Sequence, residues 1–200
     1  MPRSTTAAPT GPTEWEIPDG SRRTVHNGDV TLGARVYATS HLTGTFVLRS
    51  GRKADRYFDK YRFESDPGLL GEVVEALVPL VPRGIEGLAG LELGGVPIAT
   101  MLSSVTGLPA FFVRKEPKKY GTERLCEGGD IAGRNLLIVE DVVTTGGQVV
   151  LSAQDLRSEG AVVEHALCVI DREGGGSGVM GAEGIMLRAL FTMSELEAAV

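Results

Sequence analysis

The sequence is poor in cysteine, in positive charge and in long apolar segments. Its two cysteines, Cys126 and Cys168, match no metal-binding or redox spacing, so we expect reduced thiols in a cytoplasmic protein. Its 20 Lys and Arg residues stand against 26 Asp and Glu residues, which gives a net charge of −6. Proteins that bind nucleic acid usually show a strong basic excess, so this balance argues against a nucleic-acid partner.

Apolar segments suited to a membrane are also missing. The N-terminal segment lacks the apolar core of a secretory signal. Residues 94–113 carry no charge and are long enough to cross a bilayer. However, Pro97, Gly107 and Pro109 divide this segment into a short helix and a following strand. We therefore expect neither export nor membrane association.

The composition divides the chain into a tail and one domain. Residues 1–28 are rich in Pro, Thr, Gly and Ser, which predicts a flexible N-terminal tail. Residues 29–200 are long enough to bury a sizeable core as a single domain. The hydrophobic content of the whole chain, 42%, is ordinary for a globular protein.

Within this domain, short apolar segments alternate with helical patterns. Two extended pieces around Ser50–Gly51 come first, followed by a helix that Ser65 or Asp66 caps and that has Pro67 in its first turn. Later strands are expected at residues 87–93, 110–113, 135–139, 162–170 and 185–191, and later helices at 97–106, about 148–159 and the C-terminal segment. This alternation predicts an α/β fold with a mainly parallel central sheet and helices on both faces. In such sheets, ligands bind at the carboxyl ends of the strands.

The strand expected at residues 135–139 is followed by two acids and then by a turn rich in hydroxyls and glycine. The segment Thr144–Gly147 opens a helix, and its backbone N–H groups and hydroxyls suit a phosphate. The carboxylates of Glu140 and Asp141 suit hydroxyl donors or a divalent cation. Together these residues predict a sugar phosphate as ligand. The alternative is an acidic strand end followed by a capped helix.

Other strand ends also carry candidate residues. Residues 114–125 hold five bases and two acids, and Pro117 and Gly121 predict a loop that is either solvated or closes over a polyanion. The pair Gly94–Gly95 lets the backbone approach a ligand closely. Arg172 suits a carboxylate or imide edge of a ligand, or else a surface ion pair. The three histidines have no obvious partner, and we expect core or surface roles for them.

These segments resemble a known family. Residues 139–147, "VEDVVTTGG", are similar to the phosphoribosyl pyrophosphate (PRPP) motif of type I phosphoribosyltransferases. Residues 113–128, "VRKEPKKYGTERLCEG", resemble the catalytic loop of orotate phosphoribosyltransferases. Residues 46–67 and 168–175 resemble that family's N-terminal hood and its orotate-contacting segment. The resemblance covers about residues 30–200.

The resemblance implies an architecture as well as an activity. The implied fold is the type I phosphoribosyltransferase fold, with a small N-terminal hood at about residues 41–64 and a catalytic loop at about residues 114–129. The implied reaction joins orotate to PRPP and gives orotidine 5′-monophosphate and pyrophosphate, in pyrimidine biosynthesis. Mg²⁺ is implied as cofactor, arriving with PRPP rather than held by side chains alone. The implied working unit is a homodimer whose subunits share the catalytic loop.

Site residues follow from the resemblance position by position. The implied catalytic residues, which would meet the pyrophosphate or lie beside it, are Arg114, Lys115, Lys118 and Tyr120. PRPP would be bound by Arg49, Gly94, Gly95, Glu140, Asp141, Val142, Val143, Thr144, Thr145, Gly146, Gly147 and Gln148. Orotate would contact Thr144, Arg172, Tyr57 and Phe58.

The sequence departs from the family at three places. Tyr120 stands where many bacterial members have a loop histidine, and Gly94 stands where some place a lysine. The N-terminal tail also exceeds what the domain needs. Two alternatives are a phosphoribosyltransferase for another base and a non-catalytic protein that binds PRPP as a regulatory signal. Arg172 and the pair Tyr57–Phe58 favour a planar acidic base, although analogues of orotate stay open. The complete cationic loop and the absence of an added basic region argue against the regulatory protein.

Overall fold

A computed structural model of the protein describes residues 30–47, 51–116 and 125–200. The tail expected at residues 1–28, Ser50 of the expected turn and the middle of the expected catalytic loop lie outside the described residues.

The described residues contain alternating strands and helices. The strands are β1 His41–Val47, β2 Lys53–Phe58, β3 Gly87–Leu91, β4 Ala110–Val113, β5 Cys126–Glu127, β6 Asn135–Val143, β7 Val162–Asp171 and β8 Met186–Thr192. The helices are α1 Leu32–Ser40, α2 Tyr61–Glu64, α3 Pro67–Leu77, the 3-10 helix η1 Val78–Leu80, α4 Gly95–Thr106, α5 Gly147–Ser158, α6 Gly176–Ala182 and α7 Met193–Ala198.

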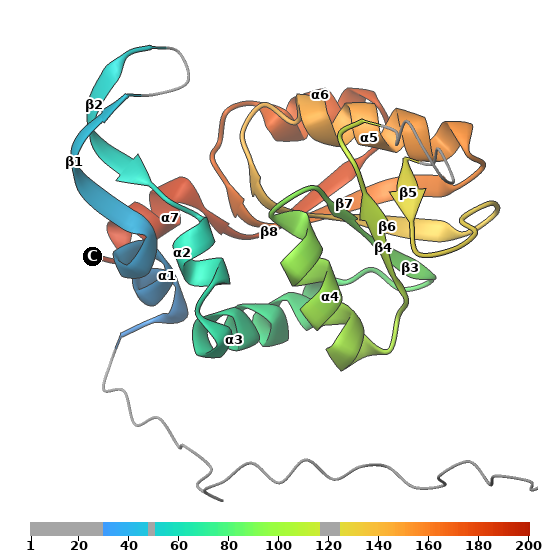
Figure 1. The fold of residues 1–200 in the computed structure, drawn as a ribbon, viewed down its shortest axis with the longest axis horizontal. Coiled ribbons are helices and arrows are strands. Elements are labelled where there is room, and N and C mark those ends of the chain that lie inside the picture. The colour runs from blue at the N-terminus through green and yellow to red at the C-terminus, as the bar shows by residue number, and fades with distance from the viewer. Residues whose placement is uncertain (1–29, 48–50, 117–124) are drawn as a thin grey trace, which may run out of the picture.

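Six of these strands form a central sheet in the order β5-β4-β3-β6-β7-β8. Every neighbouring pair from β4 through β8 is parallel, and only the short β5 runs antiparallel to its neighbour β4. The strands β1 and β2 form a separate antiparallel hairpin, which stands away from the central sheet (Figure 1). The predicted mainly parallel sheet is confirmed.

Helices cover both faces of the central sheet, as predicted (Figure 1). On one face, α5 and α6 pack on a core that includes Val149 and Ile138. On the other face, α3 and α4 lie with α1 and α7 over a core that includes Leu102 and Val139. The adjacent residues Ile138 and Val139 of β6 thus belong to opposite cores. This alternation is what a strand buried on both faces requires.

The capping signals in the sequence mark the ends of α3 and α4. The Asp66 carboxylate accepts hydrogen bonds from the N–H groups of Gly68 and Leu69 at 2.9 and 3.0 Å, and Pro67 is the first residue of α3. Gly107 ends α4 with a φ of 74°, a left-handed conformation that favours glycine.

Other elements differ from the sequence expectation. The strand β6 continues past residue 139 through Val143, because Val143 still pairs with Asp171 of β7. The helices α1 and α6 were not predicted. The glycines of residues 174–178 conceal α6, since glycine is a poor helix former.

Among the described residues, no helix has both the length and the apolar character needed to cross a membrane. The uncharged segment 94–113 forms α4 and β4 instead. This is the short helix and following strand that its prolines and glycine predict.

Replacing Asp66 with alanine should lower the free energy of unfolding by about 1 kcal/mol, because two N–H groups at the start of α3 lose their acceptor. Chemical denaturation measures this change. Glu75→Ala is the matched control, since it removes one acid from an exposed position of the same helix. It should change the free energy by less than about 0.5 kcal/mol. Equal losses in the two variants would contradict the capping role.

Candidate active site

The carboxyl ends of four parallel strands meet at one edge of the sheet. Leu91 at the end of β3 pairs with Val113 at the end of β4, and Val143 at the end of β6 pairs with Asp171 at the end of β7. The segments that follow these strands are the ones the sequence singled out. The fold therefore gathers them at the edge where parallel sheets bind ligands.

The turn between β6 and α5, where a phosphate site was predicted, lines a cavity of about 210 Å³, named the phosphate cavity below. Thr144, Thr145 and Gln148 are exposed there, and Glu140 lines the same cavity from the strand. Gly146 precedes the helix with a φ of 73°. The cavity thus lies at the N-terminus of a long helix, where backbone N–H groups and the helix dipole favour an anion.

The glycines of residues 174–178 pack against this turn. A Cβ added at Gly174 would lie 2.8 Å from the Thr144 carbonyl oxygen, and one at Gly176 would lie 2.9 Å from it. A Cβ at Gly146 would lie 2.9 Å from the Gly176 carbonyl oxygen. Small residues on both sides are required because the two backbones touch. The start of α6 therefore supports the turn from behind.

The pair Gly94–Gly95 makes an equally close contact with β6. A Cβ added at Gly94 would lie 1.6 Å from Asp141 Oδ2, and one at Gly95 would lie 2.2 Å from the Val139 carbonyl oxygen. The described contacts of both glycines are thus with β6 itself. The approach of a ligand to them stays a prediction.

The two predicted sugar-binding acids lie in different surroundings. Glu140 is partly exposed and lines the phosphate cavity. Asp141 is fully buried, and its Oδ2 lies 2.5 Å from the Lys60 ammonium, whose side chain is 31% exposed. Lys60 precedes α2, and the buried Glu64 lies at the end of that helix. The sequence motif predicted Glu140 and Asp141 as site residues. It did not predict Lys60 or Glu64, because these two residues come from a distant segment of the chain.

Burial and mutual repulsion decide which of these acids is ionised. Burial raises the pKa of Glu64 to about 9, and the charge of Asp141 adds to this rise. Burial and a hydrogen bond with Asp141 also raise the pKa of Glu140. Burial alone would raise the pKa of Asp141, but hydrogen bonds with Glu140 and Lys60 lower it. Asp141 is therefore the ionised acid of the three, and Glu64 and Glu140 hold their protons near neutral pH.

A second cavity, of about 110 Å³ and named the aromatic cavity below, brings together the predicted orotate-contacting residues Tyr57, Phe58 and Arg172. The side chains that sequence reasoning did not assign to this cavity are Tyr37, His41, Arg56, Met193 and Glu197. The rings of Tyr37 and His41 stack with their centroids 4.9 Å apart. His41, for which a core or surface role was expected, thus lies in a candidate ligand site, and its position at the start of β1 gave no sign of this.

The two cavities are joined through the backbone. The Arg172 N–H donates to the Val143 carbonyl oxygen at 2.8 Å, which ties the start of the β7–α6 segment to the end of β6. Thr144, which was predicted to contact both ligands, follows Val143 directly and lines the phosphate cavity. Neighbouring backbone segments therefore line the two cavities.

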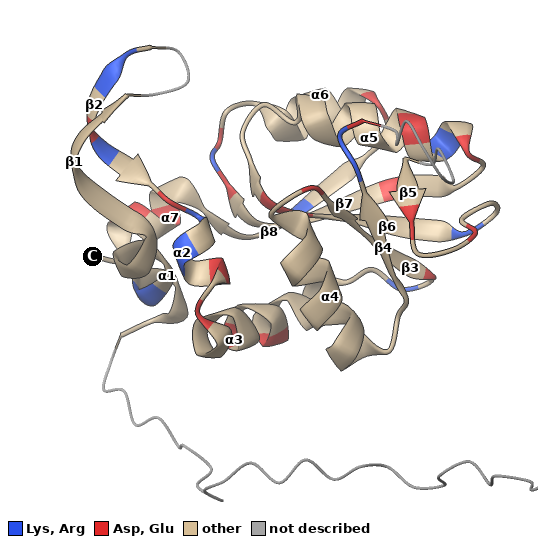
Figure 2. Ribbon diagram, viewed as in Figure 1, with Lys and Arg blue, Asp and Glu red and all other residues tan. Residues whose placement is uncertain are grey.

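The base of the cationic loop lies at the same edge (Figure 2). The Arg114 N–H donates to the Leu125 carbonyl oxygen at 3.0 Å, which closes the base of the loop. The Lys115 N–H donates to the Glu92 carboxylate at 3.0 Å, next to the Gly94–Gly95 pair. The other predicted cations and loop residues, Arg49, Lys118 and Tyr120, lie outside the described residues.

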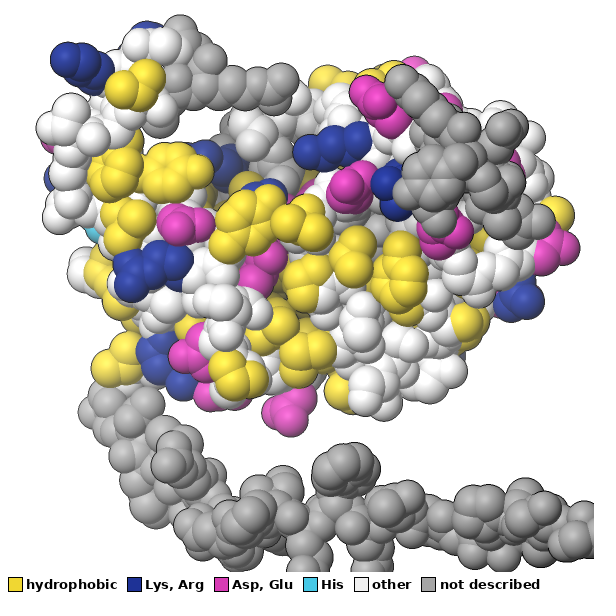
Figure 3. All heavy atoms as spheres, viewed as in Figure 1, with side chains coloured by type: hydrophobic (Ala, Val, Ile, Leu, Met, Phe, Trp, Pro, Cys, Tyr) yellow, Lys and Arg dark blue, Asp and Glu magenta, His cyan; other side chains and the backbone are white. Residues whose placement is uncertain are grey.

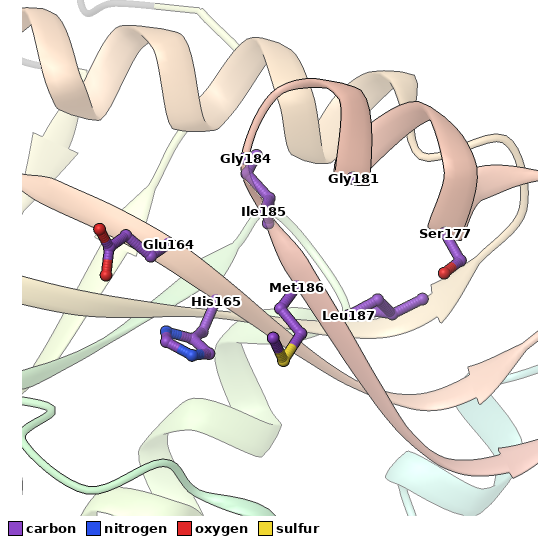
Figure 4. A pocket seen from close by; sticks show the side chains of 8 residues that line it. All are labelled: Glu164, His165, Ser177, Gly181, Gly184, Ile185, Met186 and Leu187. Carbon is purple, nitrogen blue, oxygen red and sulfur yellow. The ribbon is translucent and has the colours of Figure 1, made fainter.

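A further cavity, of about 480 Å³, lies away from this edge (Figure 4). Glu164 and His165 of β7, Met186 and Leu187 of β8, and Ser177 of α6 line it. It holds none of the predicted site residues. We place the active site at the strand ends, because two cavities with charged and hydroxyl groups converge there. Within the described residues, no cluster of His, Cys, Asp and Glu side chains is arranged to hold a metal ion.

Comparison with known proteins identifies the family, although no protein-family model matches the sequence. An orotate phosphoribosyltransferase from Nocardioides sp. is 52% identical over 171 residues, which cover 86% of this chain and 96% of the relative. The chain belongs to the orotate phosphoribosyltransferase family.

Solved structures of this family show the same fold. A crystal structure of orotate phosphoribosyltransferase from Mycobacterium tuberculosis in complex with Fe(III) dicitrate matches with a TM-score of 0.74 and 29% identity, over 82% of this chain and 96% of that chain. The same enzyme in complex with PRPP matches with a TM-score of 0.71 and 27% identity, over 83% and 96%. The predicted family and its type I phosphoribosyltransferase fold are confirmed.

The raised pKa of Glu64 makes the stability of this family member depend on pH. The usual pKa of glutamate is 4.5, and that of Glu64 in the folded protein is about 9. Between these values the folded protein keeps a proton that the unfolded chain has lost, so this contribution to stability is full below about pH 4.5 and is lost as the pH rises through about 9. Glu64→Gln keeps the neutral shape and should flatten this decline.

Chemical denaturation of the wild type and of Glu64→Gln at about pH 5 and about pH 8.5 tests this expectation. The decline is reduced rather than removed, because Glu140 contributes in the same direction. Glu75→Gln, at an exposed position of α3, is the control and should leave the decline unchanged. The same slope in the wild type and Glu64→Gln would show that Glu64 is ionised in the folded protein.

Proposed function

We propose that this chain transfers the 5-phosphoribosyl group of PRPP to orotate, giving orotidine 5′-monophosphate and pyrophosphate in pyrimidine biosynthesis. The observation that carries the proposal is the placing of a phosphate cavity and an aromatic cavity with an arginine at one sheet edge. The hydrogen bond between the Arg172 N–H and the Val143 carbonyl oxygen joins them. A sugar phosphate with a planar acidic base at its other end fits this arrangement.

The sugar phosphate is held by groups of complementary type. The turn of Thr144–Gln148 binds the 5′-phosphate through backbone N–H groups and hydroxyls. Glu140 and Asp141 bind the ribose hydroxyls: the protonated Glu140 can donate as well as accept a hydrogen bond, and the ionised Asp141 accepts. The backbone of Gly94–Gly95 meets the pyrophosphate, and Val142 and Val143 shape the floor between the phosphate and the sugar.

Orotate lies in the aromatic cavity. Tyr57 and Phe58 pack on its ring, and Thr144 contacts its edge beside the ribose. Arg172 is exposed in the ligand-free protein and pairs with the orotate carboxylate or imide edge. A guanidinium in this place selects a planar acid over a neutral base.

The reaction needs charge stabilisation more than a nucleophile. As the bond between the ribose carbon and pyrophosphate breaks, negative charge grows on the leaving group. Arg49, Arg114, Lys115 and Lys118 neutralise this charge, and the loop with Tyr120 excludes water from the ribose carbon. The Cys168 thiol is no candidate nucleophile, because burial raises its pKa and keeps it protonated.

We propose that Mg²⁺ enters with PRPP. The acids at the site offer one ionised carboxylate, Asp141, which Lys60 already neutralises, and two protonated ones, so they fit a metal-loaded substrate better than a resident ion. Mg²⁺ on the diphosphate would supply further positive charge to the leaving group.

A homodimer is proposed as the working unit, with the loop of residues 114–129 of one subunit reaching the other subunit's site. Apolar side chains gather on the face that carries α2 and the start of α4 (Figure 3). Tyr61 and Leu93, on this side of the site, are 46% and 60% exposed. An exposed apolar patch of this kind favours an interface. A cytoplasmic location is proposed from the two cysteines, both of which are buried.

Orotate turnover with Arg172→Ala tests the proposed base contact. Consumption of orotate in the presence of PRPP and Mg²⁺ is followed by absorbance, with uracil, adenine and hypoxanthine as other bases. We expect the wild type to consume orotate, and Arg172→Ala to lower kcat/KM for orotate roughly 10- to 100-fold through loss of a charge-assisted hydrogen bond. Arg83→Ala, at an exposed position before β3, is the control and should behave as the wild type.

The outcomes of this assay separate the alternatives. Turnover of another base in place of orotate would overturn the proposed substrate. PRPP binding without turnover of any base would identify a regulatory protein instead of an enzyme.

Mixing two impaired variants tests the shared loop. Lys118→Ala should lower turnover on the order of 10²-fold, if Lys118 stabilises the leaving group as oxyanion donors do. In a mixed dimer with an Arg172→Ala subunit, a shared loop places both defects in one site and leaves the other site intact. Activity should therefore reappear when the two variants are co-refolded or co-expressed. If each loop serves its own subunit, each site of a mixed dimer carries one defect, and the turnover stays as low as in the single variants.

A further inference from the structure

Lys60 is the one cation that the structure places directly on a carboxylate of the PRPP motif among the described residues. Its Nζ lies 2.5 Å from Asp141 Oδ2, and Asp141 is fully buried whereas the Lys60 side chain is 31% exposed. The lysine therefore covers the carboxylate from the solvent side. The Gly94 backbone encloses the same oxygen from another direction, because no side chain fits there.

The position of Lys60 in the chain is unfavourable for a lysine. It directly precedes α2, and its side chain makes no capping hydrogen bond to that helix. A cation at a helix N-terminus is disfavoured by the helix dipole, and the residues preferred there accept hydrogen bonds instead of donating them. The partner that favours a cation is therefore Asp141, across the site. A residue that opposes its local preference points to a role outside its own helix.

Lys60 also joins the segment that follows β2 to β6. It follows Phe58 of β2, which lines the aromatic cavity, by two positions along the chain. The intervening Asp59 is fixed to the domain by its N–H, which donates to the Ser40 carbonyl oxygen at 2.8 Å. The ion pair with Asp141 then joins this segment to β6. The Lys60 side chain thus links the segment between β2 and α2 to strand β6.

We propose that Lys60 is a positioning residue for PRPP. It holds the Asp141 carboxylate ionised and in a fixed position at the end of β6, and it ties the segment that follows the β1–β2 hairpin to the PRPP motif. This proposal rests on the proposed function, because it assumes that Asp141 meets the sugar of PRPP.

The electrostatics of the cluster agree with this role. Burial alone would lower the pKa of Lys60, but its hydrogen bond with Asp141 and the charge of that group raise it, so the ammonium stays charged. Four titratable groups interact with Asp141, namely Lys60 and Glu64 from the hood side, Glu140 from β6 and the thiol of Cys168 from β7. Only Lys60 carries a positive charge. Without it, the pKa of Asp141 would rise.

Titration of PRPP with Mg²⁺ into the protein by calorimetry, without orotate, is the first test. Lys60→Met removes the charge at nearly constant length and should weaken PRPP binding roughly 10-fold or more. Lys60→Arg keeps the charge and should recover most of the affinity. Arg62→Met removes a cation from an exposed position of the same short helix and should bind as the wild type.

The pH profile separates positioning from a merely structural role. In Lys60→Met, the loss of PRPP affinity on acidification should begin at higher pH than in the wild type, because Asp141 takes up a proton more readily. The double variant Lys60→Met with Asp141→Asn should bind no more weakly than Asp141→Asn alone. Unchanged affinity and an unchanged acid limb in Lys60→Met would overturn the proposal.

Two further controls keep the result interpretable. Thermal unfolding of each variant checks that it folds, and Lys60→Gln replaces Lys60→Met if the latter does not; the same weakening is expected. If the wild type binds PRPP but does not consume orotate, the proposed function fails while the calorimetric test of Lys60 still stands. If orotate is consumed and Lys60→Met binds PRPP normally, only the role of Lys60 fails.

Discussion

The contact between the Asp141 carboxylate and the Gly94 backbone is the constraint on which the site depends. No side chain fits at Gly94 or at Gly95, and this lets the segment after β3 approach the end of β6. That approach brings the start of α4 and the base of the cationic loop to the same edge as the PRPP motif, since the Lys115 N–H bonds to Glu92. The segment after β3, the base of the cationic loop and the PRPP motif thus meet at one edge of the sheet, where Gly94 lies against the buried Asp141 carboxylate.

Burying that carboxylate is costly unless neighbouring groups compensate for lost hydration. Lys60 supplies the opposite charge, and the two other acids of the cluster avoid repulsion by holding protons. The cluster therefore carries little net charge without a ligand, although its sequence segments are rich in acids. A negatively charged substrate is therefore not repelled by three ionised carboxylates. The one ionised carboxylate, Asp141, is balanced by Lys60, and the other groups at this edge are hydroxyls, N–H groups and cations.

Much of this site is visible in the sequence because its parts follow strands. The order of apolar segments predicts the parallel sheet, and the residues after each segment give the phosphate turn, the glycine pair and Arg172. What the sequence conceals is contact across elements. Lys60 lies at the start of a helix and His41 at the start of a hairpin strand, and their partners come from other elements: Asp141 of β6 for Lys60 and Tyr37 of α1 for His41. The glycines of residues 174–178 likewise conceal α6. Their lack of side chains allows the start of α6 to pack against the turn before α5.

The same convergence explains why a transfer reaction suits this edge. A leaving group that is already a good one needs charge stabilisation and dryness, which loops and backbone groups supply without a dedicated nucleophile. Such groups must be held at fixed distances from one another, and a parallel sheet does this by ending its strands in register. In this chain the register of Val143 with Asp171 sets the spacing between phosphate turn and Arg172, and hence the length of ligand that both can hold. The proposed selectivity for the base is in this sense a property of β6 and β7 as much as of Arg172.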